Sequence, residues 1–320
     1  MDTLNIIDCI LVILSIVMLW KGADWLVDSA SEIAHSLNVS DLIIGLTVVA
    51  FGTSAPEFAV TISAAFTGQT DISIGNVIGS NIANIFLVLG VAAIMGKKLK
   101  VHYGLVHVDL PILFGATMLF TIAIWDQHFS TFEAILSLAL LFVYMKYTIS
   151  TSKKDKEIKK EIKKRKKIKK QKLDKKVWWT LILSTIFIFF GAKYTIDSVI
   201  QISEILNIAT EIIAVSAIAL GTSLPELFVS ITAAKKGNPE MAIGNVLGSN
   251  IFNTLAVMGI PALFGKLIIP ASMLTFALPV MIIATLTYYF TTQDREVTQW
   301  EGWMLVILYI LFIGKLFNLF

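Results

Sequence analysis

The chain has 320 residues, of which 56% are hydrophobic and only 15% are charged, and its mean hydropathy is +0.78. A soluble domain carries about 25% charged residues, so this composition excludes an ordinary soluble enzyme, and no nucleic-acid partner is expected. The formal net charge of +3 says little about partners, because the basic residues are concentrated in one segment. Cys9 is the sole cysteine of the sequence, so an internal disulfide is impossible.

Long apolar runs recur along the whole chain, which is typical of a polytopic membrane protein. Several runs exceed the roughly 20 residues needed to cross a bilayer, so tilted or bent helices are expected. The sequence predicts an all-α membrane protein with ten transmembrane helices. In chain order the expected spans are 5–33, 41–66, 72–96, 104–124, 130–150, 177–203, 211–234, 240–264, 269–291 and 301–319.

Between the fifth and sixth spans, the segment Lys153–Lys176 contains fifteen Lys and Arg residues and four acids. The positive-inside rule predicts that this loop is cytoplasmic, and ten spans then place both termini outside. The loops that contain Lys97 and Lys235 fall on the same inner side, which supports the count of ten. In this interpretation the loop serves only to fix the topology. The alternative, which remains open, is that it forms a regulatory or anionic-lipid-binding helix.

The chain contains an internal repeat. A shift of 169 residues aligns Gly22–Gly90 with Gly191–Gly259 without a gap. Five spans per half is an odd number, so the second half is expected to enter the membrane upside down, which places a binding site at the midplane between the halves. The expected units are a first repeat at 1–152 with its core motif at 43–91, the lysine-rich loop at 153–176, and a second, inverted repeat at 177–320 with its core motif at 212–260.

One hexapeptide occurs in both halves, as Gly-Thr-Ser-Ala-Pro-Glu at 52–57 and Gly-Thr-Ser-Leu-Pro-Glu at 221–226. It places Glu57 and Glu226 in the middle of apolar spans. A charged side chain at the bilayer centre costs at least about 2.5–3.5 kcal/mol, so each glutamate must pair with a base, be protonated or bind a cation.

Basic partners for these glutamates are scarce within the spans. Lys21 and Lys193 lie on the first and sixth spans, and the sequence offers them better partners in Asp24, Asp28 and Asp197. A protonated, hydrogen-bonded glutamate would have to occur twice in the same motif. A bound cation is therefore the favoured interpretation.

Proline in each hexapeptide is expected to open the helix beside the glutamate. Pro56 and Pro225 lack an N–H and clash with the carbonyl four residues earlier, which belongs to Gly52 or Gly221. Unpaired carbonyls within a membrane are tolerated only inside protein or in a wet cavity, where they can serve as ligands. The alternative is a simple kink. The carbonyls expected to be freed lie near Ala50, Thr53, Ala219 and Thr222.

The ligands available are oxygen atoms. Two carboxylates with carbonyls, amide oxygens and water suit Ca²⁺, which takes six to eight oxygen ligands. No histidine or cysteine joins the cluster, since His35, His102, His107 and His128 lie at span ends or in loops, so a soft-metal site is not expected.

The third and eighth spans are expected to form the other wall of the site. Ser80 and Asn84 are four residues apart and share a helix face, as do Ser249 and Asn253. We interpret these four side chains as ligands. Small residues in the same spans are interpreted as sites of close helix packing, namely Gly75, Gly79, Gly244 and Gly248.

These doubled segments resemble the cation/Ca²⁺ exchanger superfamily and are most similar to its Na⁺/Ca²⁺ exchanger branch in archaeal or bacterial form. The resemblance rests on GTS-x-PE and GN-x-x-GSN in both halves and covers nearly the whole chain. The H⁺-coupled branch typically has a GN-x-x-E pattern where this chain has GTS-x-PE. The resemblance implies a ten-helix antiporter with four cation sites at the midplane, in which the first and sixth helices slide to alternate access.

Carried over by motif position, the resemblance implies that Glu57 and Glu226 bind Ca²⁺ together with the carbonyls of Thr53 and Thr222. It implies no resident cofactor, since Na⁺ and Ca²⁺ are cargo. The Na⁺ ligands that it implies are Ala50, Ser54, Glu57, Ser80, Asn84, Ala219, Ser223, Glu226, Ser249 and Asn253.

One position departs from some relatives. K⁺-dependent exchangers carry Asp where this chain has Asn253, which argues against K⁺ co-transport. Two ionised glutamates give the cluster a charge of −2, so exchange of more than two Na⁺ per Ca²⁺ is electrogenic. The expected protein is a K⁺-independent Na⁺/Ca²⁺ antiporter of the cell membrane, functional as a monomer.

Other functions remain as alternatives. An H⁺/Ca²⁺ antiporter would use the same two carboxylates, which titrate readily when they lie close together. A cation channel would use the same oxygens but would need no inverted repeat. An intramembrane hydrolase would need a Ser–His or Asp–Asp pair within the spans, and the histidines lie elsewhere, so the chain is not expected to be an enzyme.

Overall fold

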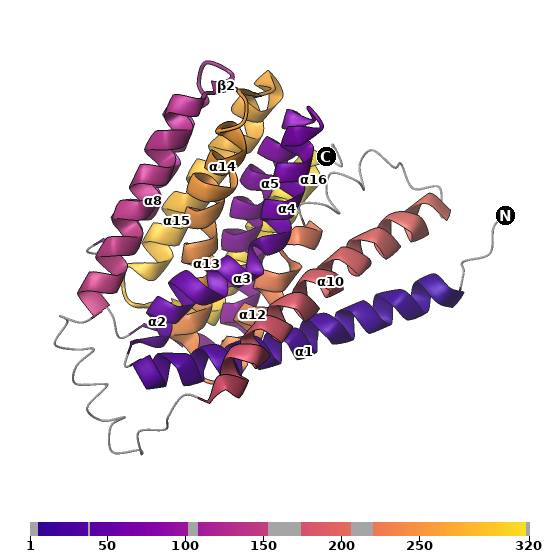
Figure 1. Ribbon diagram of the computed structural model, residues 1–320, viewed down its shortest axis with the longest axis vertical. Helices are drawn as coiled ribbons and strands as arrows, with labels where there is room; N and C mark the ends of the chain where they lie inside the picture. Colours follow the sequence, from indigo (N-terminus) through magenta and orange to yellow (C-terminus); the bar gives the residue numbers. More distant parts are fainter. Residues whose placement is uncertain (1–5, 38, 102–107, 153–173, 206–219, 318–320) are drawn as a thin grey trace.

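The computed structural model describes residues 6–37, 39–101, 108–152, 174–205 and 220–317, and these ranges are almost entirely helical. Among the described residues, seven helices are long and apolar enough to cross a membrane. The bent pair Asp41–Thr53 and Ala55–Phe66 forms an eighth crossing if it is one span. The fold is therefore that of a helical polytopic membrane protein (Figure 1).

The first half runs from the amino-terminal helix to the helix before the lysine-rich segment. Its elements are α1 (Ile6–Leu37), α2 (Asp41–Ile44), the π-helical turn η1 (Gly45–Val49), α3 (Ala50–Thr53), α4 (Ala55–Phe66), α5 (Thr70–Ala83), the π-helical turn η2 (Asn84–Leu89), α6 (Gly90–Gly96), β1 (Lys98–Lys100), α7 (Asp109–Ala123), β2 (His128–Phe129) and α8 (Thr131–Ser152).

The described part of the second half begins with one long helix and then follows the order of the first half from α4 onward, with one added π-helical turn, η5. Its elements are α10 (Lys175–Ile205), α12 (Leu224–Lys235), α13 (Pro239–Phe252), the π-helical turn η4 (Asn253–Val257), α14 (Gly259–Ala262), β3 (Leu267–Ile268), the π-helical turn η5 (Met273–Ala277), α15 (Leu278–Thr292), β4 (Glu296–Thr298) and α16 (Gln299–Leu316).

The element boundaries carry the repeat further than the sequence alignment does. Helices α4, α5 and α7 recur as α12, α13 and α15, and each begins and ends 169 residues after its counterpart. The pair α7 and α15 lies beyond the stretch in which the two halves align by sequence. Similar structure thus persists where the shared residues have been lost.

The helices differ in how deeply they are buried. The apolar windows of α5 with its continuation and of α13 with its continuation are 78% and 89% buried, whereas the windows of α1 and α10 are 33% and 28% buried. Helices α5 and α13 therefore form the centre of the bundle. Helices α1 and α10 lie side by side along its outside (Figure 1).

Glycine allows α1 and α10 to pack closely and reciprocally. A Cβ atom on Gly22 would lie 2.8 Å from Cγ1 of Ile188, and one on Gly191 would lie 3.0 Å from Cγ of Leu19. The two glycines occupy equivalent positions in the two halves, so the same close approach is made twice in one interface.

The central helix α13 also depends on glycine. A Cβ atom on Gly244 would lie 2.6 Å from the Leu42 carbonyl oxygen, and one on Gly248 would lie 2.5 Å from the Leu46 carbonyl oxygen. This confirms the interpretation of these glycines as packing positions. By contrast, a Cβ atom on Gly75 would meet only Met273 Cε at 3.5 Å, an ordinary contact.

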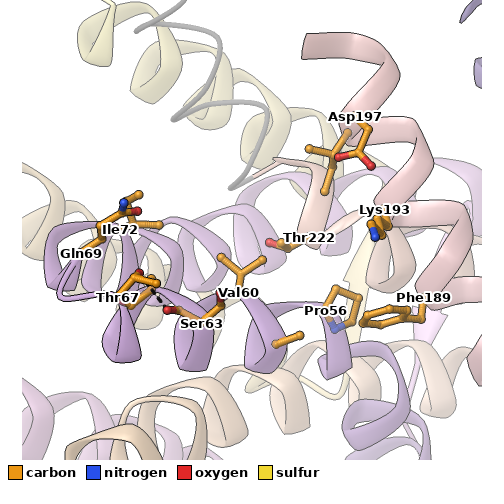
Figure 2. Close-up of a pocket in the computed structure, with 13 residues that line it drawn as sticks. Pro56, Val60, Ser63, Thr67, Gln69, Ile72, Phe189, Lys193, Asp197 and Thr222 are labelled. Atoms are coloured by element: carbon orange, nitrogen blue, oxygen red, sulfur yellow. Dashed lines mark hydrogen bonds between the residues drawn. The ribbon is translucent and has the colours of Figure 1, made fainter. Parts of the chain in front are cut away.

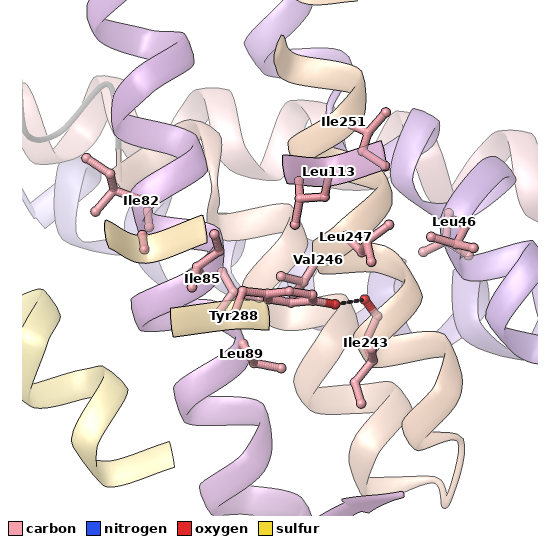
Figure 3. Packing of buried hydrophobic residues seen from close by; sticks show 14 of the residues in the cluster. Leu46, Ile82, Ile85, Leu89, Leu113, Ile243, Val246, Leu247, Ile251 and Tyr288 are labelled. Atoms are coloured by element: carbon pink, nitrogen blue, oxygen red, sulfur yellow. Dashed lines mark hydrogen bonds between the residues drawn. The ribbon is translucent and has the colours of Figure 1, made fainter. Parts of the chain in front are cut away.

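Helix α15 is joined to α13 by a buried tyrosine. Tyr288 is 0% exposed, and its hydroxyl donates a hydrogen bond of 3.2 Å to the Ile243 carbonyl. Figure 3 shows its ring between Ile85, Leu89 and Val246. The polar end of the ring is thus satisfied while its apolar body fills the core.

Two small antiparallel ladders join loops that are far apart in the sequence. β1 pairs with β4, Leu99 lying opposite Val297, and β2 pairs with β3, Phe129 lying opposite Leu267. These short strands are not expected from the sequence, which predicts an all-α protein. Each ladder fixes two loops on the same side of the helical bundle.

Several predicted spans need correction. The fourth, expected at 104–124, is the 15-residue helix α7, which is shorter than the other crossings. The second is not one helix but the series α2, η1, α3 and α4. The seventh, expected at 211–234, is described only from residue 220, and most of the lysine-rich segment 153–176 lies outside the described residues.

Candidate cation site

The first hexapeptide breaks a helix, as its proline predicts. Helix α3 ends at Thr53, Ser54 has φ −79° and ψ 9°, and α4 begins at Ala55 with Pro56 in its first turn. The helical pieces on the two sides of Ser54 are bent by 45°. Since Pro56 has no N–H to donate to the Gly52 carbonyl, the backbone next to Glu57 keeps an oxygen that the helix does not use. The Ala50 carbonyl, which was expected to be freed, instead accepts a hydrogen bond from the Ser54 N–H at 3.0 Å.

The second hexapeptide has the same geometry. Ser223 has φ −84° and ψ 1°, and α12 begins at Leu224 with Pro225 in its first turn. Both glutamates therefore lie in the first turn of a helix, next to its positive end, which favours a carboxylate.

Both glutamates are fully buried. Glu57 and Glu226 are each 0% exposed. Oε1 of Glu226 accepts hydrogen bonds from Oγ of Ser54 at 3.0 Å and Oγ of Ser249 at 3.3 Å. Within the described part of the chain, neither carboxylate oxygen of Glu57 accepts a hydrogen bond, and neither does Oε2 of Glu226. A buried carboxylate oxygen without a donor is costly, so this pair is suited to receive positive charge.

The hydroxyl groups of the two hexapeptide threonines cross between the halves. Oγ1 of Thr53 donates to Oδ1 of Asn245 at 3.1 Å, and Oγ1 of Thr222 donates to Oδ1 of Asn76 at 3.1 Å. Oγ of Ser80 lies 3.4 Å from Oγ1 of Thr222. These contacts bring the two helix breaks against α5 and α13 of the opposite half.

The asparagines expected to complete the site stand at π-helical turns. Asn84 begins η2 and Asn253 begins η4, and π-helical turns are frequent at functional sites. Nδ2 of Asn84 donates to Oδ1 of Asn250 at 3.1 Å. Oδ1 of Asn84 and both amide atoms of Asn253 are buried without a hydrogen-bond partner among the residues described. Oδ1 of Asn84 and Oδ1 of Asn253 are therefore available as further ligands for a cation.

Nearly all the predicted ligands gather in one buried cluster. Hydrogen bonds link Ser54, Glu226 and Ser249, and separately link Thr222 and Ser80. Asn84, Asn253 and Ser223 are also buried in the protein interior, but none of them is hydrogen-bonded to another predicted ligand among the described residues, and Ala219 lies outside the described residues. The predicted ligands that are at most 2% exposed are Ala50, Thr53, Ser54, Glu57, Ser80, Asn84, Thr222, Ser223, Glu226, Ser249 and Asn253.

Sequence reasoning missed Asn76 and Asn245. Both belong to the repeated motif GN-x-x-GSN. Within that motif only Ser80 and Ser249 were interpreted as ligands, together with Asn84 and Asn253, which follow it. Nδ2 of Asn76 donates to the Glu57 carbonyl at 3.1 Å, and Nδ2 of Asn245 donates to the Glu226 carbonyl at 3.4 Å. Their occurrence one helical turn before Ser80 and Ser249 was the available signal.

A cavity of about 490 Å³ lies between α4 and α10. Pro56 and Thr222 line its inner end, and Thr67 and Gln69 line it near the turn after α4. Figure 2 shows the α4 side chains on one side and Phe189, Lys193 and Asp197 of α10 on the other. The cavity therefore reaches the candidate site at Thr222.

The sequence predicted Asp24 and Asp28 as partners of the membrane lysines Lys21 and Lys193, and this prediction was wrong. Asp24 and Asp28 form ion pairs with Lys236, which follows α12, at 2.6 Å and 2.7 Å. Lys236 was overlooked because it is 212 and 208 residues distant from these acids. Lys193 and Asp197 both line the cavity.

The described residues contain no group of three or more His, Cys, Asp or Glu side chains able to hold a metal ion. His35 is exposed in the last turn of α1 and His128 lies in β2, as expected of interfacial residues, while His102 and His107 lie outside the described residues. The site is thus built from two carboxylates with hydroxyl, amide and carbonyl oxygens. Such a donor set suits hard cations.

Comparison with known proteins agrees with this geometry. The family described as sodium/calcium exchanger protein matches residues 8–150 and 176–317. The chain is 35% identical to sodium/calcium exchanger MaX1 of Methanosarcina acetivorans, covering 97% of this chain and 99% of that protein. It is 33% identical to the uncharacterized membrane protein MJ0091 of Methanocaldococcus jannaschii, covering 95% and 96%.

Solved structures are similar as well. A structure of the sodium-calcium exchanger NCX_Mj, soaked with Na⁺ and Sr²⁺, superposes with a TM-score of 0.83 at 30% sequence identity, covering 97% of this chain and 98% of that one. At this coverage the match extends over both halves. The chain belongs to the sodium/calcium exchanger family.

Proposed function

We propose that this protein is an antiporter that exchanges Na⁺ for Ca²⁺ across the cell membrane by alternating access. The observation that carries the proposal is the buried pair Glu57 and Glu226, whose carboxylates keep three oxygens without a hydrogen bond inside the described structure. Around them lie hydroxyl, amide and backbone oxygens, which are the ligands that hard cations prefer. Family membership and the relatives' activities support the identity of the cargo.

In this proposal, Ca²⁺ binds to the carboxylates of Glu57 and Glu226 and to the backbone carbonyls of Thr53 and Thr222. Na⁺ uses the carboxylates with the oxygen atoms of the serines and asparagines around them. The two ligand sets overlap at the glutamates, so Na⁺ and Ca²⁺ exclude one another. The proposed Na⁺ ligands are Ala50, Ser54, Glu57, Ser80, Asn84, Ala219, Ser223, Glu226, Ser249 and Asn253.

Obligatory exchange follows from charge. Two bare carboxylates in a closed pocket are too costly to desolvate, so only an ion-loaded site passes through the occluded state. Sliding of α1 and α10 across the remaining helices would expose the site first to one side and then to the other. Their packing against each other along the outside of the bundle supports this role.

We also propose that the fold consists of ten spans arranged as two inverted repeats of five. Ten crossings place the loops after the third and ninth spans on one side, in agreement with the pairing of β1 with β4. They place the loops after the fourth and eighth spans on the other side, in agreement with the pairing of β2 with β3. The positive-inside rule then orients the lysine-rich segment 153–176 to the cytoplasm and both termini outside.

Two finer properties follow from the residues at the site. With Asn84 and Asn253 neutral, the proposed cluster carries only the charge of its two glutamates, which argues for K⁺-independent transport. Movement of more than two Na⁺ per Ca²⁺ makes the cycle electrogenic. One chain holds both halves of the site, which supports function as a monomer.

The test is Ca²⁺ uptake into proteoliposomes that contain the purified protein. An outward Na⁺ gradient is expected to drive uptake, with no requirement for K⁺, and a pH gradient alone is expected to drive little. Uptake driven by the pH gradient and indifferent to Na⁺ would instead identify an H⁺/Ca²⁺ antiporter. Flux without any counter-ion would identify a channel.

A further inference from the structure

The first asparagine of GN-x-x-GSN in each half is not among the proposed ion ligands, yet its side chain is hydrogen-bonded to the backbone carbonyl of a proposed ligand, Glu57 or Glu226. We infer that Asn76 and Asn245 are positioning residues that set the preference of the site for Ca²⁺ over Na⁺. This inference rests on the proposed function and deepens it. It concerns selectivity, which neither family membership nor the two glutamates explain.

Each asparagine makes three hydrogen bonds that fix its orientation. Nδ2 of Asn76 donates to the Glu57 carbonyl at 3.1 Å and to Oγ1 of Thr61 at 3.0 Å, while its Oδ1 accepts from Oγ1 of Thr222 at 3.1 Å. A reversed amide would set Oδ1 against the Glu57 carbonyl, oxygen against oxygen. The side chain therefore has one favourable orientation.

The same arrangement occurs in the second half with a different residue at one position. Nδ2 of Asn245 donates to the Glu226 carbonyl at 3.4 Å and to Oγ of Ser230 at 3.0 Å, and its Oδ1 accepts from Oγ1 of Thr53 at 3.1 Å. Serine replaces threonine, but the hydroxyl is retained. The same three bonds are thus kept in both halves although Thr61 in one corresponds to Ser230 in the other, which argues that the pattern itself matters.

Each asparagine thereby joins a glutamate of its own half to a threonine of the other half. Asn76 and Asn245 are 2% and 0% exposed, so water does not readily replace these bonds. Each links the backbone of one helix break to the side chain of the other. These two side chains therefore tie the two helix breaks together at Thr53 and Thr222, whose backbone carbonyls are the proposed Ca²⁺ ligands.

This placement bears on one ion more than on the other. In the proposed ligand sets, the carbonyls of Thr53 and Thr222 serve Ca²⁺ alone, whereas Na⁺ uses other oxygens. Ca²⁺ needs its oxygens at 2.3–2.6 Å, so a threonine carbonyl that turns away is a lost ligand. Loss of an asparagine anchor is thus expected to weaken Ca²⁺ binding more than Na⁺ binding.

The experiment compares half-saturating concentrations of both ions in proteoliposomes for the wild type, Asn76→Ala and Asn245→Ala. We expect the half-saturating Ca²⁺ concentration to rise roughly tenfold or more, as for other residues that orient metal ligands, with a much smaller change for Na⁺. Asn81→Ala is the matched control, because Nδ2 of Asn81 bonds to the Val77 carbonyl of its own helix at 2.7 Å. Parallel shifts for both ions, or no shift, would overturn the inference.

A second pair of variants keeps the test decisive if an alanine variant does not fold. Thr222→Val and Thr53→Val retain the backbone carbonyl and remove only the hydroxyl that the asparagine holds. Each is expected to reproduce the Ca²⁺-selective loss, and Thr222→Val is expected to add little to Asn76→Ala, because both remove the same bond. Unchanged Ca²⁺ affinity in the valine variants would contradict the role assigned to the asparagines.

The wild type measured in the same vesicles separates the two claims. Absence of Na⁺-driven Ca²⁺ uptake in the wild type would overturn the proposed function. Normal exchange in the wild type together with parallel shifts in the variants would overturn only the selectivity role of Asn76 and Asn245.

Discussion

Ser54 donates a hydrogen bond of 3.0 Å to Oε1 of Glu226, a residue 172 positions later in the chain. The serine belongs to the helix break of the first half and the glutamate to that of the second. This bond brings the two hexapeptides together, and its counterpart is missing, since Oγ of Ser223 has no hydrogen-bond partner among the described residues. The site is therefore two-fold in sequence but not in its hydrogen bonds.

The first prediction uses this asymmetry. Ser54→Ala removes a hydrogen bond to a buried carboxylate, which is worth about 1.5–3 kcal/mol, whereas Ser223→Ala removes no observed bond. Thermal unfolding in detergent without added Na⁺ or Ca²⁺ is expected to show a lower midpoint for Ser54→Ala and little change for Ser223→Ala. Equal midpoints for the two variants would show that the bond does not persist.

The second prediction concerns the charge at Asn253. Asn253→Asp adds a third carboxylate to a cluster in which that side chain is 0% exposed. A further monovalent cation is then needed to neutralise the site, so Ca²⁺ uptake is expected to become dependent on K⁺ or on more Na⁺. Asn253→Ala separates loss of the amide from gain of charge, and K⁺ stimulation of Asn253→Ala would count against the charge argument.

The third prediction concerns the ion pairs of Lys236 with Asp24 and Asp28, which join the end of α12 to α1. The proposed sliding of α1 would break them. Lys236→Gln is therefore expected to expose the adjacent part of α1, and the labelling rate of Ser29→Cys in a Cys9→Ser background measures this. Exposed ion pairs contribute at most about 1 kcal/mol each, so an increase of several-fold is expected. Lys235→Gln is the matched control.

The pH dependence of this contact has a definite sign. Burial lowers the pKa of Lys236, but its hydrogen bonds and ion pairs with Asp24 and Asp28 raise it more, so the pKa lies above its usual value of 10.5. A raised pKa means that the contact is complete below the usual value and is lost as pH rises through the higher one. The labelling rate of Ser29→Cys itself rises with pH because only the thiolate reacts. The ratio of the rate in Lys236→Gln to the rate with Lys236 intact is therefore expected to stay constant through neutral pH, and a change in that ratio would implicate another group.

The fourth prediction tests the packing that supports the site. A Cβ atom on Gly248 would lie 2.8 Å from Cβ of Ala50 and 2.5 Å from the Leu46 carbonyl oxygen. Gly248→Ala is expected to lower the free energy of unfolding by about 1–3 kcal/mol and to weaken Na⁺ binding, because it displaces the backbone of Ala50. Gly115→Ala is the control, since nothing lies within 4 Å of its added Cβ.

Much of the site could be predicted from the sequence because its chemistry is local. The Gly, Pro and Glu of each hexapeptide predict a helix break beside a carboxylate, and the structure has that break at Ser54 and Ser223. The repeat then implies that two such breaks meet. Neither inference needs knowledge of which side chains lie in contact.

The remainder depends on contacts between distant segments. The role of Asn76 depends on Thr222, which is 146 residues away, and the partners of Asp24 and Asp28 depend on how α1 lies against α12. Short strands such as β1 and β4 form only because folding brings their loops together. Local sequence pattern contains no information about such pairings.

The account rests most directly on the two glutamates. Na⁺-driven Ca²⁺ uptake should be abolished in Glu57→Gln and in Glu226→Gln, both of which should remain folded, because a neutral amide cannot neutralise Ca²⁺ in a buried site. Glu296→Gln, which alters a loop carboxylate paired with Lys98 at 2.7 Å, should transport normally. Near-normal Ca²⁺ uptake in either site variant would contradict the account.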